Sequence, residues 1–188
     1  APGFEFRDEV AAFLHDSLSE ADSLADWTAR ILARLFAGTP LVLFAPQLPA
    51  ARRIAAEVVK REIAEPLAST RLLNERGRQL EAAGYHAQVV KSHEDCNFFL
   101  EVDGQRSKVV HRDDRFEAPE KEREFRQDEL LALLDKAPGR FSPNVALRCI
   151  VQQRLFPAAA YVAGPGEIAY WAQLQPLFEH FGVESPNG

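Results

Sequence analysis

The chain has 188 residues, of which 46% are hydrophobic and 27% charged, a composition typical of one globular domain, or of a large piece of a bigger protein, and not of a disordered chain. Its formal net charge of −6 disfavours nucleic acid as a partner, because proteins that bind the phosphate backbone normally carry a basic face. No apolar run approaches the roughly 20 residues that span a bilayer, so we expect no membrane partner either.

The N-terminal part predicts two amphipathic helices, at residues 8–18 and 24–37. Ser23 is the expected N-cap of the second helix, which Gly38 ends. The chain begins with "APGFEFRDEV", which has neither the basic nor the apolar region of a signal peptide, and it contains no methionine. We therefore expect a fragment or a processed chain rather than a natural start.

A parallel sheet is the central expectation for the fold. "LVLFA" at residues 41–45 and "AAYVA" at residues 159–163 are apolar runs of the kind that is buried on both faces of such a sheet. A long helical stretch over 50–83, broken at Pro66, follows the first run, and helices flank the second. We predict an α/β fold with a Rossmann-like parallel sheet that helices cover and that contains both runs as strands.

The middle of the chain predicts a β-hairpin. "NFFLEVDGQRSKVVHRDD" alternates on both sides of Asp103-Gly104, a pair that favours a two-residue type I′ turn with positive φ at both residues. We expect an insertion over about 86–126 that holds strands at 97–102 and 105–111 and a third near 123–126. The alternation should place Phe98, Leu100 and Val102 on one face, and Phe99 and Glu101 on the other.

Two further helices are expected after the hairpin. "QDELLALLDKAPG" predicts a short one, and Ser142 followed by Pro143 predicts the start of the next, with serine as N-cap and proline at the first helical position. In that next helix Asn144, Arg148 and Gln152 stand four apart on one face. Arg148 could hold a carboxylate through a two-pronged hydrogen bond, although a polar stripe is also what a solvated helix face shows.

The stretch "AYVAGPGEIAYWAQL" at residues 160–174 predicts a strand that enters a helix through a glycine turn. Free N–H groups at a helix start attract anions, but Pro165 has no N–H and Glu167 places a carboxylate in the first turn. The chain also has neither GxGxxG nor GxxxxGKS/T. The turn at Gly164 and Gly166 therefore favours a hydroxyl or an amine over a phosphate. The alternative is structural, with the glycines shaping the turn and the carboxylate stabilising the helix dipole.

Other chemistry-bearing residues leave two interpretations open. Tyr170 and Trp171 follow the turn and could be ordinary packing residues. His86 could carry a proton, although a lone histidine is more often structural. Cys96 and Cys149 form neither a disulfide framework nor a metal-ligand spacing, and no histidine pair has zinc spacing, so we expect no metal and a reducing, cytoplasmic setting.

The chain resembles the bacillithiol biosynthesis cysteine-adding enzyme family. "FSPNVALRCIVQQRLFPAAAYVAGPGEIAYWAQLQPLFEHFGV", with "GYHAQVV" and "NFFLEVDG" upstream, carries the resemblance, which runs from about residue 27 to residue 183. It is densest over 141–183. The chain departs from the family pattern at Cys149, where the family has Pro, at Gln153, where it has Asp, and at Ala163, where it has Gly.

The resemblance implies a ligase that joins the carboxyl of cysteine to the amine of glucosaminyl-malate and so completes bacillithiol. Family members are similar to Rossmann enzymes of the class I aminoacyl-tRNA synthetase type. The resemblance further implies ATP or another nucleotide as cofactor, and a homodimer formed through a coiled coil, for the full-length protein. Residues 1–188 would be a fragment of a larger catalytic core without the family's nucleotide motifs, and inactive by itself.

The resemblance also suggests what each candidate residue would contact. The turn of Gly164, Gly166 and Glu167 would face the acceptor amine or a sugar hydroxyl. Arg148 would face the malate carboxylates, and the ring of Tyr170 or Trp171 would line the site of the sugar. Two other functions stay open: a non-catalytic interaction or assembly domain of a degenerate homologue, and an α/β nucleotide-binding domain with another reaction.

Overall fold

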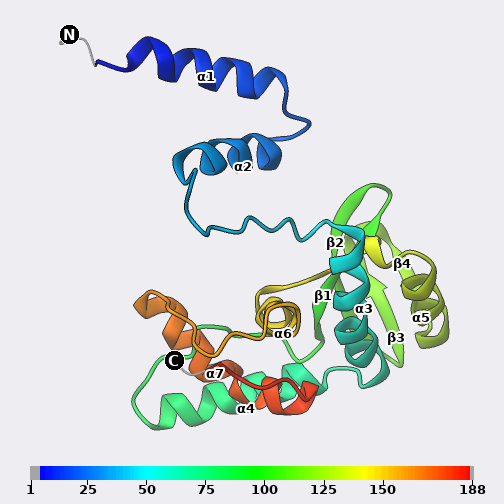
Figure 1. Ribbon diagram of the computed structural model, residues 1–188. Coiled ribbons are helices and arrows are strands. Elements are labelled where there is room, and N and C mark those ends of the chain that lie inside the picture. The colour runs from blue at the N-terminus through cyan, green and yellow to red at the C-terminus, as the bar shows by residue number, and fades with distance from the viewer. Residues whose placement is uncertain (1–4, 187–188) are drawn as a thin grey trace. The chain divides into compact units, whose positions relative to one another are not determined.

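The computed structural model describes residues 5–186, and the chain divides into two compact units, residues 1–45 and 46–188 (Figure 1). The first unit holds two helices, α1 (Arg7–Ser19) and α2 (Leu24–Leu35). Both lie where the amphipathic pattern predicts them, and the division into two units follows the end of the apolar run at 41–45.

The N-cap of α2 is the predicted one. The Ser23 hydroxyl accepts a hydrogen bond from the backbone N–H of Asp26 at 3.1 Å, which satisfies one of the free donors at the helix start. The indole N–H of Trp27 donates to the hydroxyl of Ser17 at 3.1 Å and so ties α2 to α1.

The second unit combines five helices with one sheet. Its described helices are α3 (Pro49–Ala64), α4 (Ala68–Ala82), α5 (Gln127–Lys136), α6 (Val145–Leu155) and α7 (Pro165–Phe181). Its strands are β1 (Asp95–Val102), β2 (Gln105–Arg112), β3 (Arg115–Ala118), β4 (Arg123–Phe125) and β5 (Phe141–Pro143), with short 3-10 turns η1 (Pro119–Lys121) and η2 (Pro138–Arg140). The strand order is β4-β3-β2-β1-β5, and every neighbouring pair is antiparallel.

The prediction of a Rossmann-like parallel sheet is therefore wrong for the described residues. Neither the run at 41–45 nor the run at 159–163 forms a strand of the sheet, and Val42 and Val162 are 80% and 98% exposed. An apolar run indicates that its side chains prefer burial. A strand also needs hydrogen bonds to a neighbouring strand, and the sequence of the run does not show which segment would provide them. The sheet forms instead mostly among β1 to β4, which follow one another in the chain and need only short closing loops, and β5 joins β1 from further along the chain.

The hairpin is confirmed in its turn and its faces. Val102 pairs with Gln105, and the two residues between them have positive φ, 51° at Asp103 and 73° at Gly104. The three residues expected on the inner face are buried: Phe98, Leu100 and Val102.

The strands beyond the hairpin agree only in part with the sequence. The third strand predicted near 123–126 is β4, whereas β3 was missed because its turn is Asp113-Asp114 rather than an Asp-Gly pair. Both aspartates adopt positive φ, 45° and 62°, which short polar side chains tolerate better than most. The segment 86–126 holds four of the five strands of the described sheet. Whether it is an insertion stays a prediction.

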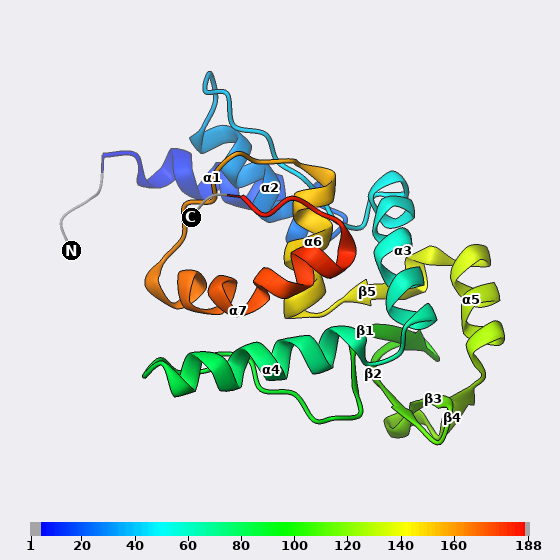
Figure 2. The same cartoon turned by 90° about the horizontal axis from the view of Figure 1, so that it is seen from below.

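The core lies between the sheet and its helices. Figure 2 shows α3 and α5 along the sheet, while α4, α6 and α7 gather beside β1 and β5. The rings of Phe98, Phe116 and Phe141 meet in this core, with centroids 6.4 Å and 6.0 Å from the central Phe98. No helix of the described part is long and apolar enough to cross a membrane.

Two predictions about helix ends have different outcomes. The break at Pro66 is confirmed, because α3 ends at Ala64 and α4 begins at Ala68. The Ser142 N-cap is wrong, because Ser142 and Pro143 lie in β5. Asn144 caps α6 instead, and its side-chain oxygen accepts from the N–H groups of Ala146 at 3.0 Å and Leu147 at 3.3 Å.

Candidate functional site

The glycine turn forms the start of α7. Gly164 is the N-cap, Pro165 is the first helical residue, and the N–H groups of Glu167 and Ile168 both donate to the Gly164 carbonyl at 3.0 Å. Neither Gly164 nor Gly166 has positive φ, and a Cβ atom at either would meet no other atom within 4 Å. Conformation and packing thus give no reason for glycine at these two positions, and both stay accessible to a close approach from outside.

Glu167 is the centre of a hydrogen-bonded group. Its Oε1 accepts from the hydroxyl of Tyr161 at 3.2 Å and from the hydroxyl of Tyr170 at 3.3 Å. The Nη2 of Arg148 donates to the Tyr170 oxygen at 3.1 Å, and its Nη1 lies 3.4 Å from Gln152 Oε1. Arg148 of α6 therefore lies together with Glu167 and Tyr170 of α7, although the sequence separates it from both.

Both phenols of this group stay protonated near pH 7, because burial above all raises their pKa. Burial raises the pKa of Tyr161 and of Tyr170, and the negative charge of Glu167 raises both further. Burial likewise raises the pKa of the neighbouring Cys149 thiol to about 11, although Arg148 and Tyr170 act against it. The thiol is neutral near pH 7 and so is not a nucleophile there.

Trp171 lies behind the group rather than in it. Its ring stacks on Tyr161, with centroids 4.3 Å apart, and on Phe178, with centroids 5.4 Å apart. Phe178 is buried in the core. The indole N–H of Trp171 is buried and finds no acceptor among residues 5–186. Trp171 thus joins Tyr161 to the core.

Tyr161 is the member of this group that sequence reasoning missed. It precedes the glycine turn, in the run that was assigned to a buried strand, so its side chain was read as part of a core. The available signal was a phenol six residues before a carboxylate in a turn that was already suspected of binding a ligand.

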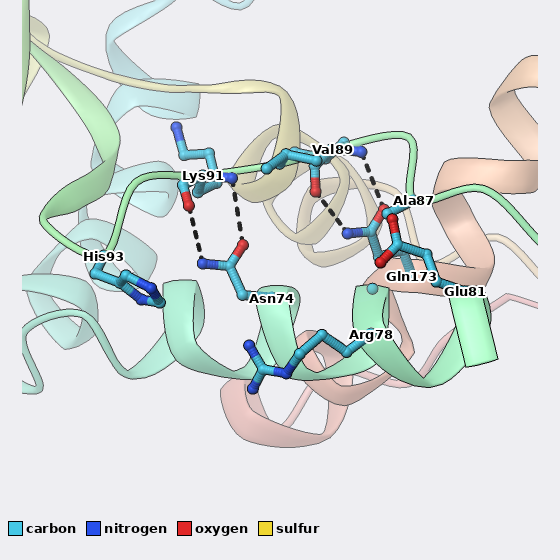
Figure 3. A pocket seen from close by; sticks show the side chains of 10 residues that line it. Asn74, Arg78, Glu81, Ala87, Val89, Lys91, His93 and Gln173 are labelled. Atoms are coloured by element: carbon cyan, nitrogen blue, oxygen red, sulfur yellow. Dashed lines mark hydrogen bonds between the residues drawn. The ribbon is translucent and has the colours of Figure 1, made fainter.

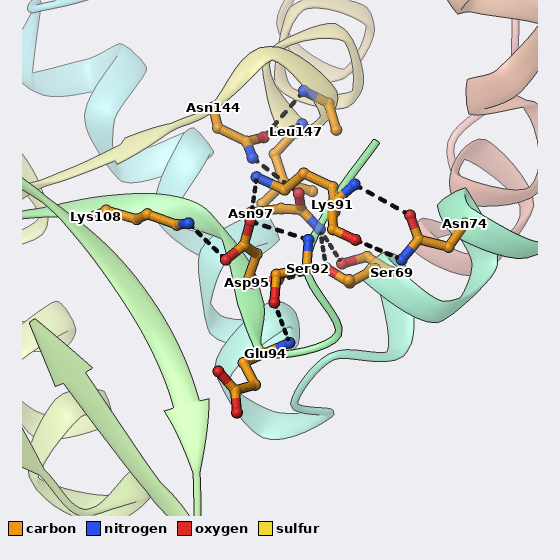
Figure 4. Close-up of polar contacts among 12 residues, drawn as sticks. Ser69, Asn74, Lys91, Ser92, Glu94, Asp95, Asn97, Lys108, Asn144 and Leu147 are labelled. Carbon is orange, nitrogen blue, oxygen red and sulfur yellow. Dashed lines mark hydrogen bonds and ion pairs between the residues drawn. The ribbon is translucent and has the colours of Figure 1, made fainter. Parts of the chain in front are cut away.

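Asn144 belongs to a different, buried network. Its side-chain N–H donates to Asn97 Oδ1 at 2.8 Å, and Asn97 in turn donates to the hydroxyls of Ser69 and Thr70, both at 2.8 Å (Figure 4). Ser69 donates to the carboxylate of Glu62, which is 1% exposed and also accepts from the Asn97 backbone N–H at 3.0 Å. Burial raises the pKa of Glu62, and these hydrogen bonds oppose that rise.

The same network joins α3, α4, β1 and α6, so it fixes the start of the helix that carries Arg148. The Arg148 backbone N–H donates to the Asn144 carbonyl at 2.8 Å. Beside it, Lys108 pairs with Asp95 at 2.6 Å, while Lys91 lies 3.9 Å from the same carboxylate, and burial lowers the pKa of Lys91. Asn144 therefore positions α6, and both its side-chain nitrogen and its side-chain oxygen have partners within the protein.

His86 lies apart from both groups. It is exposed, and no described contact joins it to Glu167 or Arg148. The segment that follows it forms no strand, and side-chain amides pair with its backbone instead. Asn74 exchanges hydrogen bonds with the Lys91 backbone at 3.0 Å and 3.2 Å, and Gln173 donates to the Val89 carbonyl at 2.6 Å and accepts from the Val89 N–H at 3.0 Å.

A cavity of about 200 Å³ lies along this segment (Figure 3). The two clamping amides, Asn74 and Gln173, belong to its wall, and His93, not His86, lines it. Within residues 5–186, no group of three or more His, Cys, Asp and Glu side chains is placed to hold a metal ion.

Comparison with known proteins links the chain to one family. The family described as "Bacillithiol biosynthesis BshC, N-terminal Rossmann-like domain" matches residues 2–187. Proteins named "Putative cysteine ligase BshC" are 35% identical over 98% of the chain in Salinibacter ruber, 38% over 88% in Koribacter versatilis and 30% over 98% in Bacillus cytotoxicus. The matched parts are 34%, 31% and 34% of those proteins, so the chain spans about a third of the length of these relatives.

Proposed function

Because the chain belongs to the bacillithiol biosynthesis BshC family, we propose that it forms part of a ligase that joins the carboxyl of cysteine to the amine of glucosaminyl-malate. The observation that carries the proposal within this chain is the hydrogen-bonded group of Arg148, Tyr170 and Glu167. This group lies beside a turn with two glycines, at positions where neither the backbone conformation nor the packing requires glycine. A cation and a carboxylate held side by side suit a substrate that has both carboxylates and an amine.

Glu167 is the proposed contact of the acceptor amine. Its Oε1 is occupied by two phenols, whereas no described residue donates to Oε2, which leaves one acceptor for an N–H group of the substrate. Gly164 and Gly166 allow the sugar to approach the backbone there. Holding the amine next to an activated carboxyl can supply a large part of the rate of amide formation.

Arg148 is the proposed contact of the malate carboxylates. It is exposed, it shares the Tyr170 hydroxyl with Glu167, and the acceptors described for its guanidinium are neutral oxygens. A guanidinium that no carboxylate neutralises can offer two N–H groups to one carboxylate. Tyr170 and the Tyr161–Trp171 stack provide the adjoining aromatic surface for the sugar.

The residues of the turn do not fit a nucleotide phosphate. Pro165 has no N–H group to donate, and the Glu167 carboxylate would oppose an anion at the helix start. ATP or another nucleotide as the activating cofactor is thus proposed for the full-length protein on the resemblance alone, and no contact in this chain is assigned to it. A homodimer and a cytoplasmic location are proposed on the same basis. Both cysteines are free and buried, which is compatible with a reducing compartment.

A non-catalytic role is the second candidate, and one observation favours it. Gln153 stands where the family pattern has Asp, and its amide exchanges hydrogen bonds with the backbone of Ala158, donating at 2.9 Å and accepting at 3.3 Å. An aspartate cannot make the donating bond. The residue at this position therefore supports the loop through a bond that the family's aspartate could not make, which fits a degenerate homologue.

The substitution Glu167→Gln in the full-length protein tests the proposed function. Gln keeps the shape and removes the charge, so kcat/KM for glucosaminyl-malate should fall about ten- to a hundredfold, the value of one hydrogen bond to a charged group. Glu179→Gln, an exposed carboxylate later in α7, is the matched control and should leave the kinetics unchanged. Equal kcat/KM values in the two variants would contradict the proposal.

A further inference from the structure

Two of the three tyrosines of the chain direct their hydroxyls to one carboxylate oxygen. Tyr161 reaches Glu167 Oε1 from the loop before α7, and Tyr170 reaches it from the first turns of α7 itself. The third tyrosine, Tyr85, is 67% exposed and lies outside this group. Both donors are neutral, so within the described residues Glu167 forms no direct ion pair, and Arg148 reaches it only through the Tyr170 hydroxyl.

The donor and the acceptor of each hydrogen bond in this group follow from the chemistry of the side chains. A phenol has one proton, and a carboxylate can only accept, so each tyrosine donates to Glu167. The Tyr170 oxygen then uses a lone pair to accept from Arg148 Nη2. Hydrogen bonds therefore run from Arg148 through Tyr170 to Glu167, and from Tyr161 to the same oxygen.

The position of the Tyr161 hydroxyl is set by the core. Its ring stacks on Trp171, with an interplanar angle of 21°, and Trp171 stacks on the buried Phe178 at 27°. The hydroxyl is thus held on a rigid aromatic column, although Tyr161 itself belongs to a loop. A merely structural reading is that the bond to Glu167 ties this loop to α7.

We propose that Tyr161 and Tyr170 are positioning residues that hold Oε1 of Glu167 and leave Oε2 to receive the acceptor amine. Tyr170 also fixes the distance between this carboxylate and Arg148, so that the amine and the carboxylate of one substrate are recognised as a pair. This inference rests on the proposed function of the site and adds to it a reason for the orientation of Glu167.

The test is a double-mutant cycle in the full-length protein with glucosaminyl-malate and cysteine as substrates. Tyr161→Phe removes the hydroxyl and keeps the stack on Trp171, and Tyr85→Phe is the matched control. Tyr161→Phe should raise KM for glucosaminyl-malate about three- to tenfold, the value of one hydrogen bond, and leave KM for cysteine unchanged. In a Glu167→Gln background the same substitution should change KM less than about twofold, because residues that act through each other are not additive.

The outcomes separate the inference from the proposed function. If Glu167→Gln impairs the acceptor kinetics but Tyr161→Phe does not, or if the two effects multiply, the tyrosine only ties the loop and the inference is overturned. If Glu167→Gln leaves the kinetics intact, the proposed site itself fails. A loss of thermal stability in Tyr161→Phe with normal KM also overturns the inference, since that is the result of a purely structural bond.

Discussion

Two polar groups in the second unit use the same kinds of side chains with different results. Around Asn97, every amide, hydroxyl and carboxylate described is buried and engaged, and the bonds close on one another. Around Glu167, the residues are partly exposed, one carboxylate oxygen has no described donor, and the guanidinium of Arg148 meets only neutral oxygens. A buried group whose members hydrogen-bond to one another stabilises the fold. A group at the surface that has an acceptor without a donor can bind a ligand.

The largest expected effect comes from breaking the buried group. Asn97→Ala removes the acceptor of the Asn144 amide and two hydrogen bonds to hydroxyls, and should destabilise the chain by about 3 kcal/mol, because a buried polar group without a partner costs about 1–3 kcal/mol by itself. Denaturant unfolding measures this change in the free energy of unfolding. Glu167→Gln should cost less than about 1 kcal/mol in the same assay, since only a dipole interaction and surface bonds change. Equal losses of stability in the two variants would contradict the distinction between a structural group and a ligand-binding group.

A comparison of two glycines gives smaller effects of opposite sign. A Cβ at Gly77 would lie 3.0 Å from Gln173 Nε2 and 3.3 Å from the Ala87 Cβ, so Gly77→Ala should cost about 1–3 kcal/mol through overpacking. Gly166 has open space around it and a helical position, so Gly166→Ala should be neutral or stabilise by up to about 1 kcal/mol.

The two glycine variants differ in a second way that sharpens the comparison. In the full-length protein, Gly166→Ala should raise KM for glucosaminyl-malate although the fold is intact, because the methyl group occupies the space where the substrate approaches. Thermal melts and steady-state kinetics on the same preparations measure both quantities. A variant that is stable and kinetically normal would show that Gly166 serves no ligand.

The parts of the fold that the sequence predicted are those decided by neighbours in the chain. Asp103-Gly104 sets its own turn, Ser23 caps the helix that follows it, and Pro66 ends the helix that precedes it. The sheet was mispredicted because pairing is a property of two segments. The apolar run at 41–45 has the composition of a buried strand, but composition does not identify the strand with which it would pair.

The candidate site was predictable to a similar degree. Arg148, Glu167 and Tyr170 were identified by their spacing and by the resemblance, and the structure brings them together. Asn144 was placed with Arg148 because both share a helix face. Helical periodicity does not predict that the amide of Asn144 contacts Asn97 in β1, nor that Tyr161 donates a hydrogen bond to Glu167.

The most direct test of the ligand-binding role of the glycine turn is a crystal structure of the full-length protein with glucosaminyl-malate bound. The amine nitrogen should lie within hydrogen-bond distance of Glu167 Oε2, at about 2.7–3.2 Å, with a malate carboxylate on Arg148. An acceptor bound elsewhere, or a phosphate group seated on the turn at Gly164 and Gly166, would contradict this assignment.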